Sequence, residues 1–423
     1  MSRALQAVRE AAIDGRLHSI IYRQTQLEKL HRILVGNVEG VEKAIRRDSG
    51  HSDAEAAAEF TLTLKAIRDY YATLDEKASL RCEYALARGE DASGRRDPVG
   101  IVYIVPTDYC LFYSVVVAAG AAIAAGNCVI IQLRQLQNTL KEVPSLLRKL
   151  LKSALDPSVV DFVPEPASDD DLGPSHIRVF QDSRSASKAQ LVVAIVDQGA
   201  NLEQTAATLV SARFAFGGHS PYAPDIVLVH EFVKKEFLKA VVEAMMRIAV
   251  SLSATTSLDQ ERDTQNTEQK TYRSEILLAS YIFAAPKSAK YLSQFVPSQA
   301  SFVNHVPHEL LVGPATPRHT PVDRSLRYPI NLFSISHAEY ATATMSDAVH
   351  EIIRNTDSHY LVKLFKEVAV PLKPQTPRSG GGQIGFFEQG IYIGLGMFGV
   401  PTILAIGALG FFGVRFALSS ARS

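Results

Sequence analysis

Five side chains in two short stretches of the sequence, 106–110 and 218–222, could move protons or hold a reactive molecule in place. They are one carboxyl, one imidazole and three hydroxyl groups, on Asp108, His219, Ser220, Tyr109 and Tyr222. A carboxyl or an imidazole beside hydroxyl groups suits general acid–base chemistry. The alternative stays open that Asp108 and His219 are solvated loop residues without a chemical role.

The cysteines indicate neither a disulfide framework nor a metal site. There are three, Cys82, Cys110 and Cys128, an odd number without paired spacing. That pattern is typical of a reducing compartment and does not predict zinc ligands. Cys110 is the only thiol beside the two stretches, and we interpret it as a small apolar residue after a turn. We expect Cys128 to belong to the core.

The elements before and after the first stretch predict a parallel sheet. Residues 100–105 form a β-branched run closed by Pro106, residues 111–125 form an apolar helix, and residues 128–132 form a second strand. Such a β-α-β unit with short connections indicates a doubly wound α/β architecture.

The same pattern returns around the second stretch. We expect strands at 192–196 and 226–229, each followed by a helix, at 202–214 and 232–248. Residues 1 to about 80 show helical periodicity and form an α-helical entry, with one amphipathic run at 54–74. The polar stretch 250–272 has no periodicity and predicts a surface loop.

The composition excludes a nucleic-acid role and favours a folded body. Lys and Arg number 44 against 44 Asp and Glu, so no excess positive charge is available for phosphates. Hydrophobic residues make up 47% of the chain, which is too apolar for a disordered protein.

The mean hydropathy of +0.04 hides one concentrated apolar segment. Residues 390–414 carry no charge in 25 positions, and a helix of that length rises about 37 Å, enough to cross a bilayer. We expect a kink near Pro401. Residues 371–389 form a linker rich in Pro and Gly. The N-terminus has no apolar run typical of a signal peptide, so we expect a single-pass membrane protein with a cytosolic body.

Several segments together carry a family resemblance. Residues 97–102 (DPVGIV) lead to 120–127 (GAAIAAGN), and residues 223–230 are APDIVLVH. With 194–197, 201–203, 278–283 and 302–304, their order over about residues 15 to 340 resembles the aldehyde dehydrogenase superfamily, most closely its membrane-tailed fatty-aldehyde branch. The resemblance implies truncated, doubly wound aldehyde-dehydrogenase-like α/β sheets, an α-helical N-terminal entry and a C-terminal transmembrane helix. It also favours the endoplasmic reticulum.

The catalytic groups of the family do not carry over. Its cysteine nucleophile precedes a hydrophobic-Ala-Pro-Asp sequence, and here Pro221 stands at that position. A proline cannot form the thiohemiacetal that releases hydride. The general-base glutamate has no counterpart, and Asp108 replaces the asparagine that stabilises the oxyanion, where a carboxylate opposes negative charge.

Cofactor binding is also expected to be lost. Gln132 replaces the lysine that holds the adenosine ribose, and Gln181-Asp182-Ser183 replaces the Gly-Ser phosphate turn. Asp182 would repel a pyrophosphate. The ribose clamp falls in a region that is absent between Ser251 and Leu278. We therefore expect no NAD(P) and no metal.

The resemblance thus implies a degenerate member without its catalytic Cys and Glu. Our main hypothesis is a cofactor-independent biosynthetic enzyme, of the kind that fungal pathways recruit, for isomerisation, dehydration or cyclisation of a lipophilic small molecule. One alternative is a non-catalytic membrane scaffold or partner of an active pathway enzyme. Another is a residual NAD(P)-dependent aldehyde dehydrogenase.

The domain and partner predictions follow from the same resemblance. We expect a cofactor-like domain at 1–200, a catalytic-like domain at 201–305, a bridging segment at 306–370, the linker at 371–389 and the anchor at 390–414. A β-hairpin at about 81–96 and a late strand near 325–334 would support a homodimer or a complex with a pathway enzyme.

Overall fold

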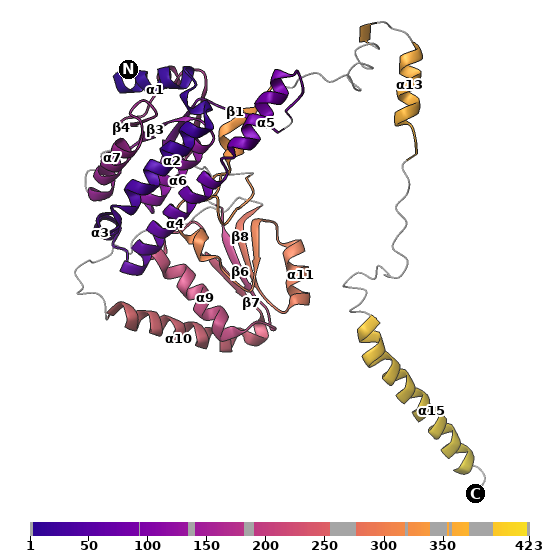
Figure 1. Ribbon diagram of the computed structural model, residues 1–423. Helices are drawn as coiled ribbons and strands as arrows, with labels where there is room; N and C mark the ends of the chain where they lie inside the picture. Colours follow the sequence, from indigo (N-terminus) through magenta and orange to yellow (C-terminus); the bar gives the residue numbers. More distant parts are fainter. Residues whose placement is uncertain are drawn as a thin grey trace. The chain divides into compact units, whose positions relative to one another are not determined.

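The computed structural model describes residues 3–92, 94–133, 140–181, 190–253, 276–317, 320–338, 353–354, 358–371 and 392–420. The chain divides into two units, Met1–Thr342 and Ala343–Ser423. The first unit holds the sheets and the second holds the C-terminal helices (Figure 1).

The N-terminal entry is helical, as the periodicity predicted. It comprises α1 (Arg3–Ile13), η1 (Arg16–His18), α2 (Ile20–Val35), α3 (Val38–Ser49), α4 (Asp53–Ala72) and α5 (Glu76–Ala87). The start of α4 is set by a capping box, in which the Ser52 side chain accepts from the Glu55 N–H and the Glu55 carboxylate accepts from the Ser52 N–H. Glu55 and Glu59 both lie on this helix.

The prediction of a β-hairpin at 81–96 is wrong. Residues up to Ala87 belong to α5, whose first turn is capped by the Asp75 carboxylate 3.1 Å from the Ala78 N–H. Helix-forming residues fill that stretch, so the backbone satisfies its hydrogen bonds locally. The strand that does follow, β1 (Arg96–Pro98), pairs antiparallel with β10 (Ser334–Ser336) of the same chain.

The late strand predicted near 325–334 is also corrected. Only its last residue is in a strand, because η5 (Ile330–Phe333) occupies the positions before β10. Arg96 fixes this junction, since its Nε donates to Ser334 Oγ at 2.8 Å.

The first sheet is fully parallel, in the order β4-β3-β2-β5. Its strands are β2 (Ile101–Val105), β3 (Cys128–Gln132), β4 (Val160–Val163) and β5 (His176–Phe180). Helix α6 (Leu111–Ala124) connects β2 to β3 and is buried on every face, between the sheet and the helices α2 and α4. Helices α7 (Glu142–Ala154) and α8 (Asp169–Leu172) complete this half of the unit.

Asn127 explains why the GAAIAAGN run ends as it does. Its side chain is fully buried, accepts from the Gly100 N–H at 2.8 Å and donates to the Phe333 carbonyl at 2.8 Å. One amide therefore joins the turn before β3, the start of β2 and the segment before β10. A carboxylate could not make the bond to Phe333.

The second sheet is also parallel, in the order β7-β6-β8-β9. It contains β6 (Val192–Val196), β7 (Ile226–Val229), β8 (Leu277–Phe283) and β9 (Ser298–Val303). Helix α9 (Leu202–Phe214) and helix α11 (Pro286–Phe295) lie on opposite sides of it, and α10 (Lys234–Ser253) packs along α9 (Figure 1). Strand β6 is in this sheet, so the predicted range 1–200 spans parts of both sheets.

The loop predicted at 250–272 begins later than expected, because α10 continues to Ser253. The rest of it lies outside the described residues, as does the linker 371–389 except for its first residue.

The C-terminal unit contains α13 (Ser358–Val368), the π-helical turn η6 (Leu395–Gly399) and α15 (Val400–Ser420). Residues Tyr392–Gly413 form a helix that is long and apolar enough to cross a membrane by length and composition. The wider turn immediately precedes Pro401, which cannot donate to the carbonyl four residues before it.

Candidate functional site

Two loops at the ends of secondary-structure elements carry the candidate groups. The first runs from the end of β2 to α6, where Cys110 adopts a left-handed backbone (φ 46°) as it caps the helix. The second runs from η2 (Ala215–Gly218) to β7, and Phe216 in it has φ 52°. The Phe216 N–H donates to Glu55 Oε1 at 2.6 Å, so α4 holds the second loop in place.

The Tyr109 and Ser220 side chains join the two loops. The Ser220 side chain is near enough to the Tyr109 phenol to affect its pKa, and the Tyr109 hydroxyl donates to the Leu311 carbonyl. Burial, followed by the neighbouring Cys110, raises the pKa of the Tyr109 phenol, and the nearby Ser220 hydroxyl acts in the opposite direction. Tyr109 therefore stays a neutral hydroxyl at physiological pH.

Tyr222 is buried completely beneath this contact. Its hydroxyl lies 3.1 Å from both the Thr316 hydroxyl and the Thr316 N–H, and its carbonyl accepts from the Tyr281 hydroxyl at 2.9 Å. Every polar atom of the side chain is thus engaged within the protein. The structure brings Tyr109, Ser220 and Tyr222 together, but Tyr222 acts there as a packing and hydrogen-bonding residue.

Arg327 fills the centre of this region. It is 3% exposed, and its guanidinium donates to the carbonyls of Pro314 (2.6 Å), Val312 (3.0 Å), Glu309 (3.3 Å) and Leu310 (3.4 Å). The surrounding tyrosines raise its pKa against the opposing effect of burial, so the charge is retained. Segment 309–316 is therefore fixed over the two loops.

Asp108 and His219 lie at the surface, each next in sequence to one member of the Tyr109–Ser220 contact. The acid–base candidates are thus accessible to solvent, whereas Ser220 and Tyr222 are buried and Tyr109 is half-buried.

Position 221, which the resemblance assigns to the family's cysteine nucleophile, is a proline, and we therefore consider Cys110, the thiol in the first stretch. Pro221 is half-buried there. Cys110 is 1% exposed, and burial, followed by the charge of Glu59, raises the pKa of its thiol well above the usual value. A thiol acts as a nucleophile only when ionised, so Cys110 is inert in this setting.

Gln132 and Gln181 are the described residues at the positions that the resemblance assigns to a dinucleotide site. Gln132 is buried and its Oε1 accepts from the Tyr103 hydroxyl at 3.0 Å. Gln181 turns inward, where its Nε2 donates to the Ser114 carbonyl at 2.8 Å and the Tyr328 hydroxyl at 2.9 Å. Both are neutral amides that offer no positive charge to a pyrophosphate. Asp182 and Ser183 lie outside the described residues.

Sequence analysis missed Thr316, Arg327 and the buried pair His51 and Glu59. The two atoms His51 Nδ1 and Glu59 Oε2 lie 3.6 Å apart, and Glu59 Oε1 accepts from the Tyr113 N–H at 3.2 Å. No spacing rule links these residues to the loops they support. The one available signal was that Glu59 falls on the apolar face of its predicted helix.

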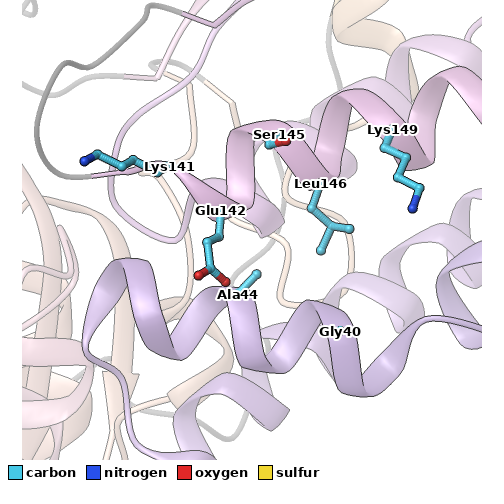
Figure 2. A pocket seen from close by; sticks show the side chains of 7 residues that line it. All are labelled: Gly40, Ala44, Lys141, Glu142, Ser145, Leu146 and Lys149. Atoms are coloured by element: carbon cyan, nitrogen blue, oxygen red, sulfur yellow. The ribbon is translucent and has the colours of Figure 1, made fainter.

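The described residues contain no group of three or more His, Cys, Asp or Glu that could hold a metal ion. They do contain a groove of about 340 Å³ between α3 and α7 (Figure 2). It is lined by Gly40, Ala44, Lys141, Glu142, Ser145, Leu146 and Lys149. Arg47 pairs with Glu142 at 2.7 Å, and the Asp48 carboxylate caps the first turn of α7. The charged groups of Arg47, Asp48 and Glu142 are therefore already bound within the protein. The groove shares no residue with the two loops.

Comparisons with known proteins agree with the fold. Residues 1–172 match the model of the aldehyde dehydrogenase family. Aldehyde dehydrogenase family 3 member B1 of Mus musculus is 33% identical over 168 residues, which cover 38% of this chain and 34% of the mouse protein. The 4,4'-diaponeurosporen-aldehyde dehydrogenase of Staphylococcus aureus is 25% identical over 245 residues, covering 52% of each chain.

Solved structures extend the likeness over most of the chain. The substrate-bound state of Staphylococcus aureus AldH has a TM-score of 0.56 at 15% identity and covers 81% of this chain and 94% of its own. This likeness shows the fold, and the sequence similarity to aldehyde dehydrogenases covers residues 1–172 in the family model. The chain spans about a third of the length of the mouse relative.

Proposed function

We propose that this chain, which has the aldehyde dehydrogenase fold, is a membrane-anchored protein that works without NAD(P) and without a catalytic thiol. The carrying observation is that a half-buried proline stands at position 221 and that burial raises the pKa of the Cys110 thiol well above its usual value. Oxidation of an aldehyde through a thiohemiacetal requires a thiolate, and none of the described side chains around Pro221 supplies one.

Membrane attachment is supported by the helix Tyr392–Gly413. Its 22 residues rise about 33 Å, slightly more than the hydrocarbon core of a bilayer. We place the body in the cytosol and the anchor in the endoplasmic reticulum, which the family resemblance favours. Carbonate extraction and fractionation of cells test this, and recovery of the full chain in the soluble fraction would contradict it.

The geometry favours a binding or scaffold role for the body. Tyr222, Ser220, Thr316 and Arg327 are all at most 7% exposed, and their polar atoms bind one another or the backbone. Segment 309–316 covers them, so these buried polar side chains stabilise the fold. The surface that remains can hold a lipophilic small molecule or a pathway enzyme at the membrane.

Titration of NAD and of NADP against the purified full chain by calorimetry tests the central proposal. We expect no saturable heat, because Gln132 and Gln181 offer neutral amides at the described part of the dinucleotide site. An active aldehyde dehydrogenase measured beside it is the positive control. Tight, saturable binding of either dinucleotide would contradict the proposal.

A second candidate is cofactor-independent acid–base catalysis on a lipophilic molecule, such as an isomerisation, dehydration or cyclisation. The proximity of Tyr109 and Ser220 favours it, because the loops that carry the exposed Asp108 and His219 come near each other there. Metabolite screening with the wild-type protein would first identify a conversion. Asp108→Asn and His219→Ala should each abolish that conversion while the variant protein remains folded. An unaltered rate in both variants would exclude this candidate and leave the scaffold role.

A further inference from the structure

Helix α13 presents an apolar face that no described residue of its own unit covers. Leu361, Phe365 and Val368 are spaced four and three residues apart, so they lie on one face of the helix. Their exposed fractions are 54%, 66% and 65%. Glu367 is two residues from Phe365 and therefore points to the opposite side. The helix is amphipathic and lacks an apolar partner among the described residues of its unit.

A helix of 11 residues is marginal in water unless a surface buries its apolar face. The length of chain between α13 and the apolar span keeps the helix within reach of the bilayer. Residues 369–391 separate Val368 from Tyr392, where the apolar span begins, and they extend to at most about 80 Å. Once the span is inserted, α13 cannot leave the neighbourhood of the bilayer, and the local concentration of lipid around it is high.

We propose that α13 lies flat in the bilayer interface as a second membrane contact, with Leu361, Phe365 and Val368 toward the acyl chains and Lys366 and Glu367 toward water. This inference rests on the proposed membrane anchor. The helix is about 16 Å long and cannot cross a core of about 30 Å, so it lies on the membrane and does not span it. Amphipathic helices of this kind bury their apolar face about 5–10 Å into the headgroup and acyl boundary.

The charge of the polar face agrees with this orientation. Lys366 is exposed in the last turn, where its positive charge also faces the carbonyl end of the helix dipole. Over residues 351–378 the sequence has five Lys or Arg and three Asp or Glu, so the region carries a small excess of positive charge. Anionic headgroups strengthen the binding of such a helix.

The chain contains no tryptophan, which permits a direct test. Three single variants of the full chain, Phe365→Trp, Glu367→Trp and Leu404→Trp, are reconstituted into vesicles of phosphatidylcholine and phosphatidylserine. The phosphatidylcholine is either unlabelled, brominated close to the headgroup or brominated deep in the chain. Glu367→Trp is the matched control on the opposite face of α13, and Leu404→Trp reports the span.

We expect shallow bromine to quench Phe365→Trp at least about twofold more than Glu367→Trp, since only the first lies at the depth of interfacial helices. Deep bromine should quench Leu404→Trp. If Leu404→Trp is quenched but Phe365→Trp is quenched no more than Glu367→Trp, the second contact is wrong while the anchor stands. A blue-shifted, unquenched Phe365→Trp would show α13 packed on protein and would overturn the inference. An unquenched Leu404→Trp would remove the anchor and the inference with it.

Discussion

The guanidinium carbon of Arg327 lies 5.4 Å from the ring centre of Tyr222 and 6.0 Å from that of Tyr113. The two tyrosines come from different halves of the first unit, Tyr113 from α6 and Tyr222 from the loop before β7. A buried cation between two aromatic faces is favourable because the rings are electron-rich. Arg327 therefore ties the loops of the candidate site to segment 309–316 from within.

Replacing Arg327 by Met should lower the free energy of unfolding by about 3 to 5 kcal/mol, because buried carbonyls of segment 309–316 lose a charged donor. Urea unfolding of the full chain followed by circular dichroism measures this. Arg324→Ala is the control, since Arg324 is exposed and its bond to Glu309 contributes at most about 1 kcal/mol. Equal midpoints for the two variants would contradict the central role of Arg327.

Gly313 and Gly40 should respond to alanine in opposite directions. Gly313 has φ +80°, and a Cβ there would lie 2.3 Å from Tyr113 Cδ1. Gly313→Ala should therefore destabilise the fold by about 2 to 4 kcal/mol. Gly40 lies inside α3 with nothing near its Cβ position, so Gly40→Ala should stabilise by about 0.5 to 1 kcal/mol. Thermal unfolding of both variants checks the sign, and a stabilised Gly313→Ala would refute the packing described.

The stability of the body should decline in alkaline solution partly through Cys128. Burial raises the pKa of this thiol from 9.0 to about 12. The unfolded chain ionises first, so the contribution of Cys128 is complete below pH 9.0 and is lost as the pH rises toward the folded value, by about 1.4 kcal/mol per pH unit. Urea midpoints of wild type and Cys128→Ala at several pH values measure the difference. Parallel slopes above pH 9 would show that Cys128 does not titrate as described.

Local sequence patterns predicted the sheets well, for a physical reason. The run Cys128–Gln132 is apolar on both faces and lies between a Gly-Asn turn and a polar stretch, so only a buried parallel strand satisfies it. Strands β6 and β7 and helix α9 matched their expected bounds for the same reason. The family resemblance supplied the order of these elements.

The candidate site was harder to predict because its contacts join distant residues. Tyr109 and Ser220 are 111 positions apart in the sequence, and Arg327, from a third segment, lies against the rings of Tyr113 and Tyr222. Asp108 and His219 are exposed, whereas Ser220 and Tyr222 are buried, and the type of a residue does not reveal its exposure. The hairpin at 81–96 was expected by resemblance alone, whereas the Asp75 cap and the helix formers after it favour α5.

Restoring the missing thiol should not restore aldehyde oxidation. Pro221→Cys places a sulfur at the position that the resemblance assigns to the nucleophile, and the half-buried site gives it room. On the proposal above the rest of the machinery would still be incomplete, since the resemblance finds no counterpart of the general-base glutamate and Gln132 and Gln181 are neutral amides. A thiol titration under native conditions should count one more reactive group than in the wild type, which verifies that the new sulfur is accessible. Long-chain aldehyde with NAD or NADP should then give no rise in absorbance of the reduced cofactor above the wild-type background. Turnover by Pro221→Cys would mean that a base and a dinucleotide site persist, and the proposal of a chain that works without NAD(P) would be wrong.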